Sequence, residues 1–352
     1  MINSITITTE NDKTKKSVIK QRNLGIELLR AFLCFRIIIL HYYSSTNNYI
    51  LSLKSNRFQV PCFFFISFYF LYPTIYQRNE IKLKMRLERL LVPYIGHPII
   101  NWIINNLMFS LIGFNRYNRY LTLNDLKTQL IVGRGIYGIA VLWFHFNLLI
   151  FTILFFIFSY LMGNYFLVIF QLLAIYSYKF HYSGINYKFF HLYTENIWMS
   201  VGNLNETFPI AISAFSFASI NFFQIILKQR KRYLFFSFIL FYAISNSNIF
   251  TYIFGFTTTG VKQNFLSLFL FIFFSLLPLE FLNQIFLLFI KQITKYTQGI
   301  YCLHFVFQYY LKIGIDKNGT FIGCVFLYII SYVASLIGFN ICSNTKLKFL
   351  FS

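Results

Sequence analysis

Two ionisable side chains within one apolar stretch, Arg30 and His41, have a spacing that suits catalysis. They are 11 residues apart, and 11 helical steps of about 100° return to within about 20° of the same direction. Both side chains would therefore project from one face of a helix, about 16 Å apart along its axis. An imidazole with a pKa near about 6.5 suits a general base, and a guanidinium suits binding of negative charge. Arg36, in the same stretch, points away from that line.

Each residue of this pair also has a purely structural explanation. His41, followed by Tyr42 and Tyr43, could be an interfacial residue of an aromatic belt, and Arg30 could extend to the lipid headgroups. The pair is more informative than either residue, because ionisable groups inside an apolar span are costly and usually indicate function.

A second pair, Arg86 and Arg89, lies in the segment RLERLLVPY just before an apolar stretch. Residues spaced i, i+3 are neighbours on a helix surface. Two guanidinium groups there would suit a phosphate-bearing ligand that approaches from the cytosol. The alternative, basic residues that only fix membrane topology, is favoured by the nearby Lys82 and Lys84.

Two weaker groups complete the candidates. Tyr301 and His304 share a face in GIYCLHF, and Trp143 with His145 lies in LWFHFNLL, where an interfacial Trp is usually an anchor. The six His are scattered, with no HxxxH or HExxH pattern, so the sequence predicts no metal site.

The elements that must position these residues are membrane helices. Of 352 residues, 57% are hydrophobic and 12% are charged, whereas soluble domains have about 25% charged residues. The fold class predicted is all-α, a polytopic transmembrane bundle of about ten helices. Apolar stretches of about 20 residues occur near 24–46, 58–77, 90–113, 139–161, 163–180, 205–227, 233–255, 264–284, 297–315 and 319–341. The pairs at 139–180 and 264–315 have blurred boundaries, which leaves nine or eleven helices open.

The basic residues predict how the spans are oriented across the membrane. The 31 Lys and Arg, which produce a net charge of +21, lie in short runs between apolar stretches, so no nucleic-acid partner is expected. The tight basic clusters all fall on one side of a ten-span arrangement, which predicts a multi-pass protein of the inner (cytoplasmic) membrane with both termini cytoplasmic. We expect a disordered cytoplasmic tail at 1–23, a transmembrane domain at 24–341 and a short cytoplasmic tail at 342–352.

Five segments occur together and in order: IELLRAFLCFRIIILHYY, VPCFFFISFYFL, RLERLLVPY, LWFHFNLL and GIYCLHF. In this combination the chain resembles acyltransferase family 3, whose members are membrane-bound O-acyltransferases that modify cell-surface polysaccharides. The resemblance runs from residue 24 to residue 341, and its most specific parts are Arg30 with His41 and Arg86 with Arg89. Two positions depart from the usual pattern: Phe68 stands where Gly is usual, and His145 where Leu is common.

The resemblance implies an enzyme that moves an acyl group, commonly acetyl and not aminoacyl, from cytoplasmic acetyl-CoA or another acyl-CoA. The acceptor would be a hydroxyl of a cell-envelope or exported polysaccharide, or of a lipid-linked sugar. The resemblance would make His41 catalytic with Arg30 as its partner, and would place Arg86 and Arg89 at the acyl-CoA. Further passage-lining candidates are Ser67, Trp143, Tyr301 and His304. Membrane lipids and glycan-assembly proteins are the other expected partners, and no metal is expected.

A transporter or flippase of a glycan or polyprenyl-linked intermediate is the alternative function. It accounts equally well for many helices and a polar passage, but not for the two basic pairs. It also predicts paired Gly or Pro interruptions, and the six Pro, four of which lie in the second and third spans, argue against a repeated broken-helix design. The acceptor, the acyl chain, the oligomeric state and the choice between direct transfer and a covalent acyl-enzyme stay open.

Overall fold

The computed structural model describes residues 23–42, 58–112, 142–173, 195–220, 222–246, 259–279, 282–314 and 319–352. Within these ranges every regular element is a helix, and no strand occurs. The longer helices are α1 (Leu24–Tyr42), α3 (Gln59–Tyr76), α4 (Glu80–Ile112), α6 (Leu142–Met162), α9 (Glu195–Ser219), α11 (Arg230–Asn246), α13 (Thr259–Leu276), α14 (Gln284–Lys295), α15 (Thr297–Gly314) and α16 (Phe321–Ile341). Shorter ones are α10 (Phe222–Lys228), η2 (Gly163–Tyr165), residues 166–173 and η4 (Lys346–Leu350).

The all-helical prediction of about ten helices is confirmed. Each of the ten apolar stretches contains a helix, although α4 begins at Glu80, ten residues before the stretch predicted at 90–113. The blurred stretch at 264–315 resolves into three helices rather than two, because α14 occupies residues 284–295 between α13 and α15. The predicted tail at 1–23 lies outside the described residues, apart from Asn23.

Side-chain caps fix where several helices begin. The Asn283 side-chain oxygen accepts a hydrogen bond from the Ile285 amide at the start of α14, and Thr320 accepts one from Gly323 at the start of α16. Asn23 does the same for the Ile26 amide in α1. Each cap satisfies one of the amide groups that a first helical turn leaves unpaired.

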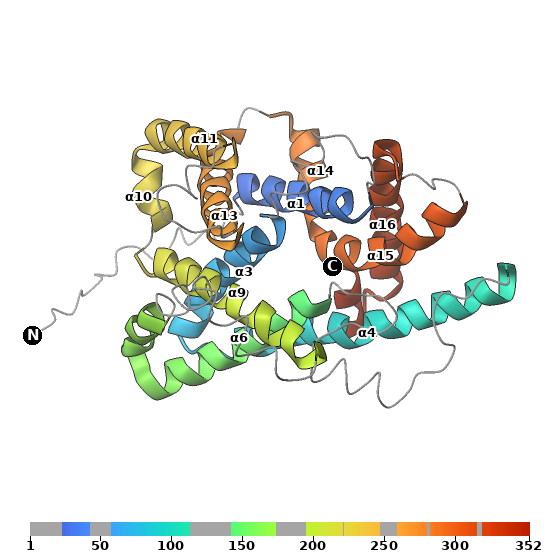
Figure 1. Cartoon of the computed structure of the whole chain (residues 1–352), viewed down its shortest axis with the longest axis horizontal. Helices are drawn as coiled ribbons and strands as arrows, with labels where there is room; N and C mark the ends of the chain where they lie inside the picture. The colour runs from blue at the N-terminus through green and yellow to red at the C-terminus, as the bar shows by residue number, and fades with distance from the viewer. Residues whose placement is uncertain are drawn as a thin grey trace, which may run out of the picture.

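The core is unusually aromatic and has two parts. The larger part surrounds α3, where Phe68 packs edge-on against Phe151, Phe155 and Phe215 from α6 and α9. The second part joins α1, α15 and α16. Figure 1 shows α1 and α4 running along the long axis of the view, while α13 and α16 cross that direction. The α1–α15 interface lies in the second part, and it holds the candidate site.

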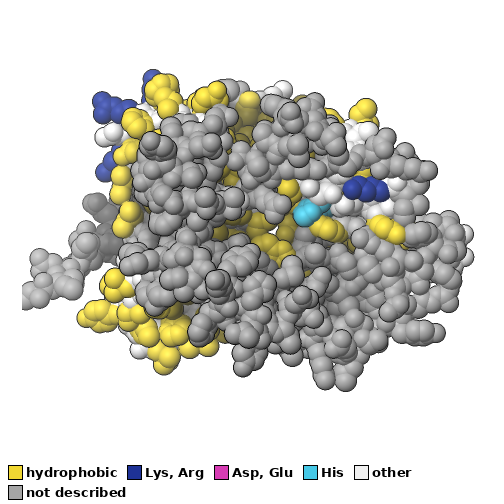
Figure 2. All heavy atoms as spheres, viewed as in Figure 1, with side chains coloured by type: hydrophobic (Ala, Val, Ile, Leu, Met, Phe, Trp, Pro, Cys, Tyr) yellow, Lys and Arg dark blue, Asp and Glu magenta, His cyan; other side chains and the backbone are white. Residues whose placement is uncertain are grey.

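Apolar side chains also face outward. Among the described residues, two helices, α6 and α16, are long and apolar enough to cross a membrane by length and composition. On α16 the exposed residues follow helical spacing, as do those on α4, and Figure 2 shows hydrophobic side chains on the described surface of one face. The members on α16 are Ile322, Phe326, Ile329, Val333, Ile337 and Ile341. Continuous exposed apolar stripes favour a lipid environment.

The segment 342–352 packs back onto the helices. It includes η4, which contacts α4 and α16, and Leu350 is buried there. The carbonyl oxygen of Leu350 lies 2.9 Å from the buried Nε2 of His97 in α4. The cytoplasmic location predicted for this segment stays a prediction.

Candidate active site

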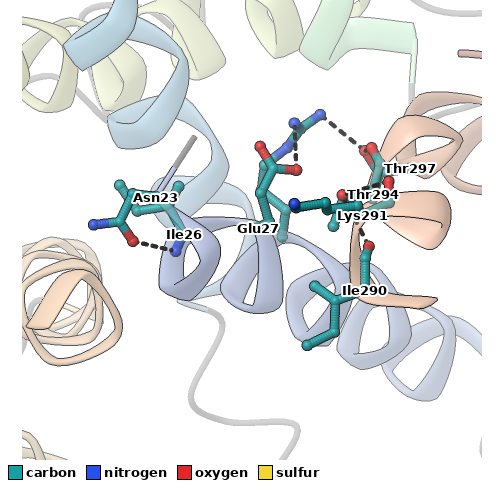
Figure 3. Close-up of polar contacts among 8 residues, drawn as sticks. Asn23, Ile26, Glu27, Ile290, Lys291, Thr294 and Thr297 are labelled. Carbon is teal, nitrogen blue, oxygen red and sulfur yellow. Dashed lines mark hydrogen bonds and ion pairs between the residues drawn. The ribbon is translucent and has the colours of Figure 1, made fainter. Parts of the chain in front are cut away.

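Arg30 lies between α1 and the first turn of α15. Its Nη2 donates a hydrogen bond of 2.9 Å to the Thr297 hydroxyl, and its Nη1 lies 3.7 Å from a carboxylate oxygen of Glu27 one turn earlier. Figure 3 shows these two contacts, with Lys291 of α14 extending toward Glu27. The two contacts fix the guanidinium, while the Arg30 side chain as a whole stays one-third exposed.

His41, at the other end of α1, contacts the same neighbouring helix. Its ring stacks on His304 with centroids 5.9 Å apart and packs against Phe305 at 4.7 Å. The Gln308 side chain donates a 3.0 Å hydrogen bond to the His41 carbonyl. Because Arg30 meets residue 297 and His41 meets residues 304 to 308, the two helices run parallel. Both side chains therefore lie on the face of α1 toward α15, as their spacing predicts.

His304 has one ring nitrogen held and the other without a partner. Its Nδ1 lies 3.2 Å from the Ile300 carbonyl, and because a carbonyl only accepts, that nitrogen carries the proton. Its Nε2 is buried without a hydrogen-bond partner. In the neutral ring this leaves a lone pair on Nε2.

A second layer of polar rings lies behind this pair. Tyr301, one turn before His304, has its ring centroid 6.2 Å from His304 and 6.1 Å from His145 of α6. Tyr301 and His145 are both buried. The structure thus brings the candidates from GIYCLHF and LWFHFNLL together, although Trp143 itself packs on Phe64 in the aromatic core.

Three buried polar residues of α4 escaped the sequence reasoning: His97, Asn101 and Asn105. Their spacing of four places them on one helix face. Polar residues repeated every four positions in the apolar segment HPIINWIINN are the signal that could have found them. They cost free energy to bury and therefore mark α4 as a further wall of the polar region.

The two arginines of RLERLLVPY contact different elements. Arg86 turns inward, and its Nη2 donates a 3.2 Å hydrogen bond to the Ser67 carbonyl of α3. Arg89 stays exposed, with its guanidinium 5.6 Å from the ring centroid of Phe349 in η4. Ser67 therefore contacts Arg86, and it does so through its backbone carbonyl. Arg36 faces away, 5.2 Å from the ring centroid of Phe58.

A separate pocket of about 240 Å³ is lined by Tyr76, Arg78, Ser159, Gly163 and Phe166, none of which is a predicted site residue. Among the described residues, no group of three or more His, Cys, Asp or Glu could hold a metal ion.

Comparison with known proteins gives the chemistry of this arrangement. A family model described as an acyltransferase domain matches residues 23–342, nearly the whole chain. Comparisons with curated proteins and with solved structures give no match. The match begins just before α1 and ends just after α16, so it includes the α1–α15 interface and both basic pairs. The chain therefore belongs to acyltransferase family 3, and its reaction is the transfer of an acyl group.

Proposed function

We propose that this acyltransferase moves an acetyl or similar acyl group from cytoplasmic acyl-CoA to a hydroxyl of a cell-envelope or exported polysaccharide. The acceptor would be the polymer or a lipid-linked sugar precursor. The protein would be a multi-pass protein of the inner membrane, with both termini cytoplasmic. The exposed apolar stripes of α4 and α16 support the membrane setting, and the basic residues of RLERLLVPY support a cytosolic donor.

His41 is the base in this proposal. As the acceptor oxygen attacks the thioester carbon, His41 takes the hydroxyl proton and an oxygen–carbon bond forms. The carbon–sulfur bond then breaks, the CoA sulfur leaves with the electron pair, and the proton that His41 took passes to this sulfur, which restores neutral His41. The His304 ring stacks on the His41 ring and so fixes the orientation of the base.

Arg30 stabilises negative charge in the same passage. Negative charge develops on the thioester carbonyl oxygen during attack. Arg30 and His41 contact α15 two turns apart, at residues 297 and 304, so the guanidinium does not contact the carbon that is attacked. It acts on the developing negative charge through the low-dielectric interior, where charges are weakly screened. Thr297 and Glu27 hold the Arg30 side chain toward α15 before any substrate binds. Arg86 and Arg89 bind the donor, because guanidinium groups pair well with phosphates.

The observation that carries the proposal is the contact of both Arg30 and His41 with α15. A topological cation and an interfacial histidine would not need to meet the same buried helix. Transport of a glycan would not require this pairing either, and the family match assigns acyl transfer.

The test is transfer of radioactive acetyl from acetyl-CoA into envelope glycan by membranes that contain the protein. His41→Ala should lower transfer by roughly 10²- to 10⁴-fold, the usual contribution of a positioned base. Leu40→Ala is the matched control, because it truncates the adjacent residue of the same helix turn. Near-normal transfer by His41→Ala at equal protein abundance would exclude His41 as the base.

A further inference from the structure

The turn η4 gathers two cations on one aromatic ring. Phe349 has the Arg89 guanidinium 5.6 Å from its ring centroid and the Lys348 ammonium 5.9 Å from it. An aromatic face attracts a cation, so both cations are held at this one ring. Two cations held in this way form a ready site for an anion.

The turn is held in place from several sides. The Leu350 carbonyl accepts from His97, and the Leu350 side chain fills the space above Gly96 in α4. Phe351 lies against Gly299 of α15 and Gly338 of α16, where a methyl group on either glycine would collide with it. The ring of Phe349 is therefore presented at a defined position by its two neighbours.

One acidic residue opposes the cations at this surface. Lys346 in the same turn forms a 2.6 Å ion pair with Glu88, the residue next to Arg89. Lys346 is the more exposed partner, at 68% against 25% for Glu88. The ion pair therefore neutralises the carboxylate nearest to Arg89, which leaves the net charge around Phe349 positive.

We propose that Arg89 and Lys348, which lie at the Phe349 ring, and Lys346 of the same turn bind the phosphate groups of the acyl donor. The inference rests on the proposed function, since it takes acyl-CoA as the donor. It adds residues 345–351 to the residues that bind the donor, which the sequence alone gave no reason to include. The nucleotide end of CoA carries a diphosphate and a 3′-phosphate, which suit several separated cations better than one.

The test measures the Kd of CoA and of dephospho-CoA, which lacks the 3′-phosphate, for the full-length protein in phosphatidylcholine nanodiscs. Lys346→Ala and Lys348→Ala should each raise the Kd of CoA roughly threefold to tenfold, the range for one partly exposed charged contact. Lys231→Ala is the matched control, because Lys231 is an exposed basic residue at the start of α11. Glu88→Gln should lower the Kd, since it removes the opposing charge.

Comparing the Kd changes for CoA and dephospho-CoA shows which phosphate group the turn binds. If the lysine variants weaken only CoA, the turn binds the 3′-phosphate, and if they weaken both ligands equally, it binds the diphosphate. Lysine variants that match Lys231→Ala for both ligands would overturn the proposal. If wild-type protein bound neither ligand, the proposed donor itself would be wrong, which is a separate result.

An anionic lipid headgroup carries the same phosphate chemistry, and a second arm distinguishes it. Nanodiscs with added phosphatidylglycerol should leave the Kd of CoA unchanged apart from a general salt-sensitive shift that Lys231→Ala shares. Competition by this lipid that disappears only in the Lys346 and Lys348 variants would assign the turn to lipid and overturn the donor site.

Discussion

Two glycines that touch the C-terminal turn should respond differently to the same substitution. In Gly96→Ala the new methyl group would meet only the end of the Leu350 side chain. In Gly299→Ala it would lie 2.7 Å from the Phe351 carbonyl oxygen, 2.9 Å from the Phe351 Cα and 2.6 Å from the Ser335 hydroxyl. A side-chain end can rotate away, whereas backbone atoms can move only with the whole turn.

The magnitudes follow from this difference. Alanine stabilises a helix by up to about 1 kcal/mol relative to glycine. At Gly96 a rotamer change of Leu350 costs about 0.5–1.5 kcal/mol, so the net effect should be close to zero. At Gly299 overpacking costs about 1–3 kcal/mol, which exceeds the helix gain. Gly299→Ala should therefore displace residues 345–351 and destabilise the protein by about 1–2 kcal/mol.

Hydrogen exchange of peptides that cover residues 342–352 measures the displacement directly, and thermal unfolding measures the free energy. Exchange should rise in Gly299→Ala and stay at the wild-type level in Gly96→Ala. Both substitutions add one methyl group beneath the same turn. Equal exchange in the two variants would therefore show that the Phe351 backbone does not pack against Gly299.

Three further predictions concern the site and the turn. Thr297→Val removes the 2.9 Å acceptor of Arg30 at constant shape, and we expect acetyl transfer to fall roughly fivefold, about 1 kcal/mol for a partly exposed charged hydrogen bond, as measured by kcat with the acyl-CoA KM unchanged. His304→Gln removes the ring that stacks on His41 and orients it, so kcat should fall about tenfold or more; an unchanged kcat would show that His304 does not position the base. The hydrogen bond from Lys346, with the charges of Lys346 and Lys84, holds the pKa of Glu88 below its ordinary value of 4.5 against the opposing effect of burial. Because the pKa of Glu88 is lower in the folded protein, its ion pair stabilises the turn at any pH above 4.5, and this stabilisation is lost as the pH falls through the lowered pKa. The hydrogen-exchange rate of η4 in Glu88→Gln, divided by the wild-type rate, should therefore be above one near neutral pH and approach one in acid.

The sequence was sufficient for the helices and for the orientation of α1. Apolar length alone determined the ten stretches, and the angular spacing of Arg30 and His41 correctly predicted a common face. The extra helix α14 was not predictable from apolar length. It is only 12 residues long, too short for a span, and it begins after the Asn283 cap. Its polar ends were therefore interpreted as part of a loop.

The arginine pair shows that helical spacing does not predict which neighbour each side chain contacts. Residues at i and i+3 differ by about 60° around a helix axis, which is small on an isolated helix. Against packed neighbours that angle is enough to send Arg86 to the Ser67 carbonyl inside and Arg89 to the surface at Phe349. The packing of the C-terminal turn against the helices was also not predictable from the sequence. Gly96, Gly299 and Gly338 are distant in sequence, and they come together to leave space for Leu350 and Phe351 only after folding.

Helix α15 connects the parts of the site that sequence analysis treated separately. Within its first turn Thr297 holds Arg30, Gln298 donates to the Arg89 carbonyl at 3.1 Å, and Gly299 leaves space for Phe351. Two turns later His304 stacks on His41. One rigid helix thus sets both the position of the base and the position of the cations, because a shift of α15 along its axis would move all four contacts together. A substitution that leaves α15 in place should instead act on one contact at a time: Thr297→Val acts on Arg30 and the chemical step, whereas Gly299→Ala acts on the turn and the donor. If both changed the acyl-CoA KM and kcat in the same ratio, α15 would be a general scaffold rather than a wall shared by two distinct subsites.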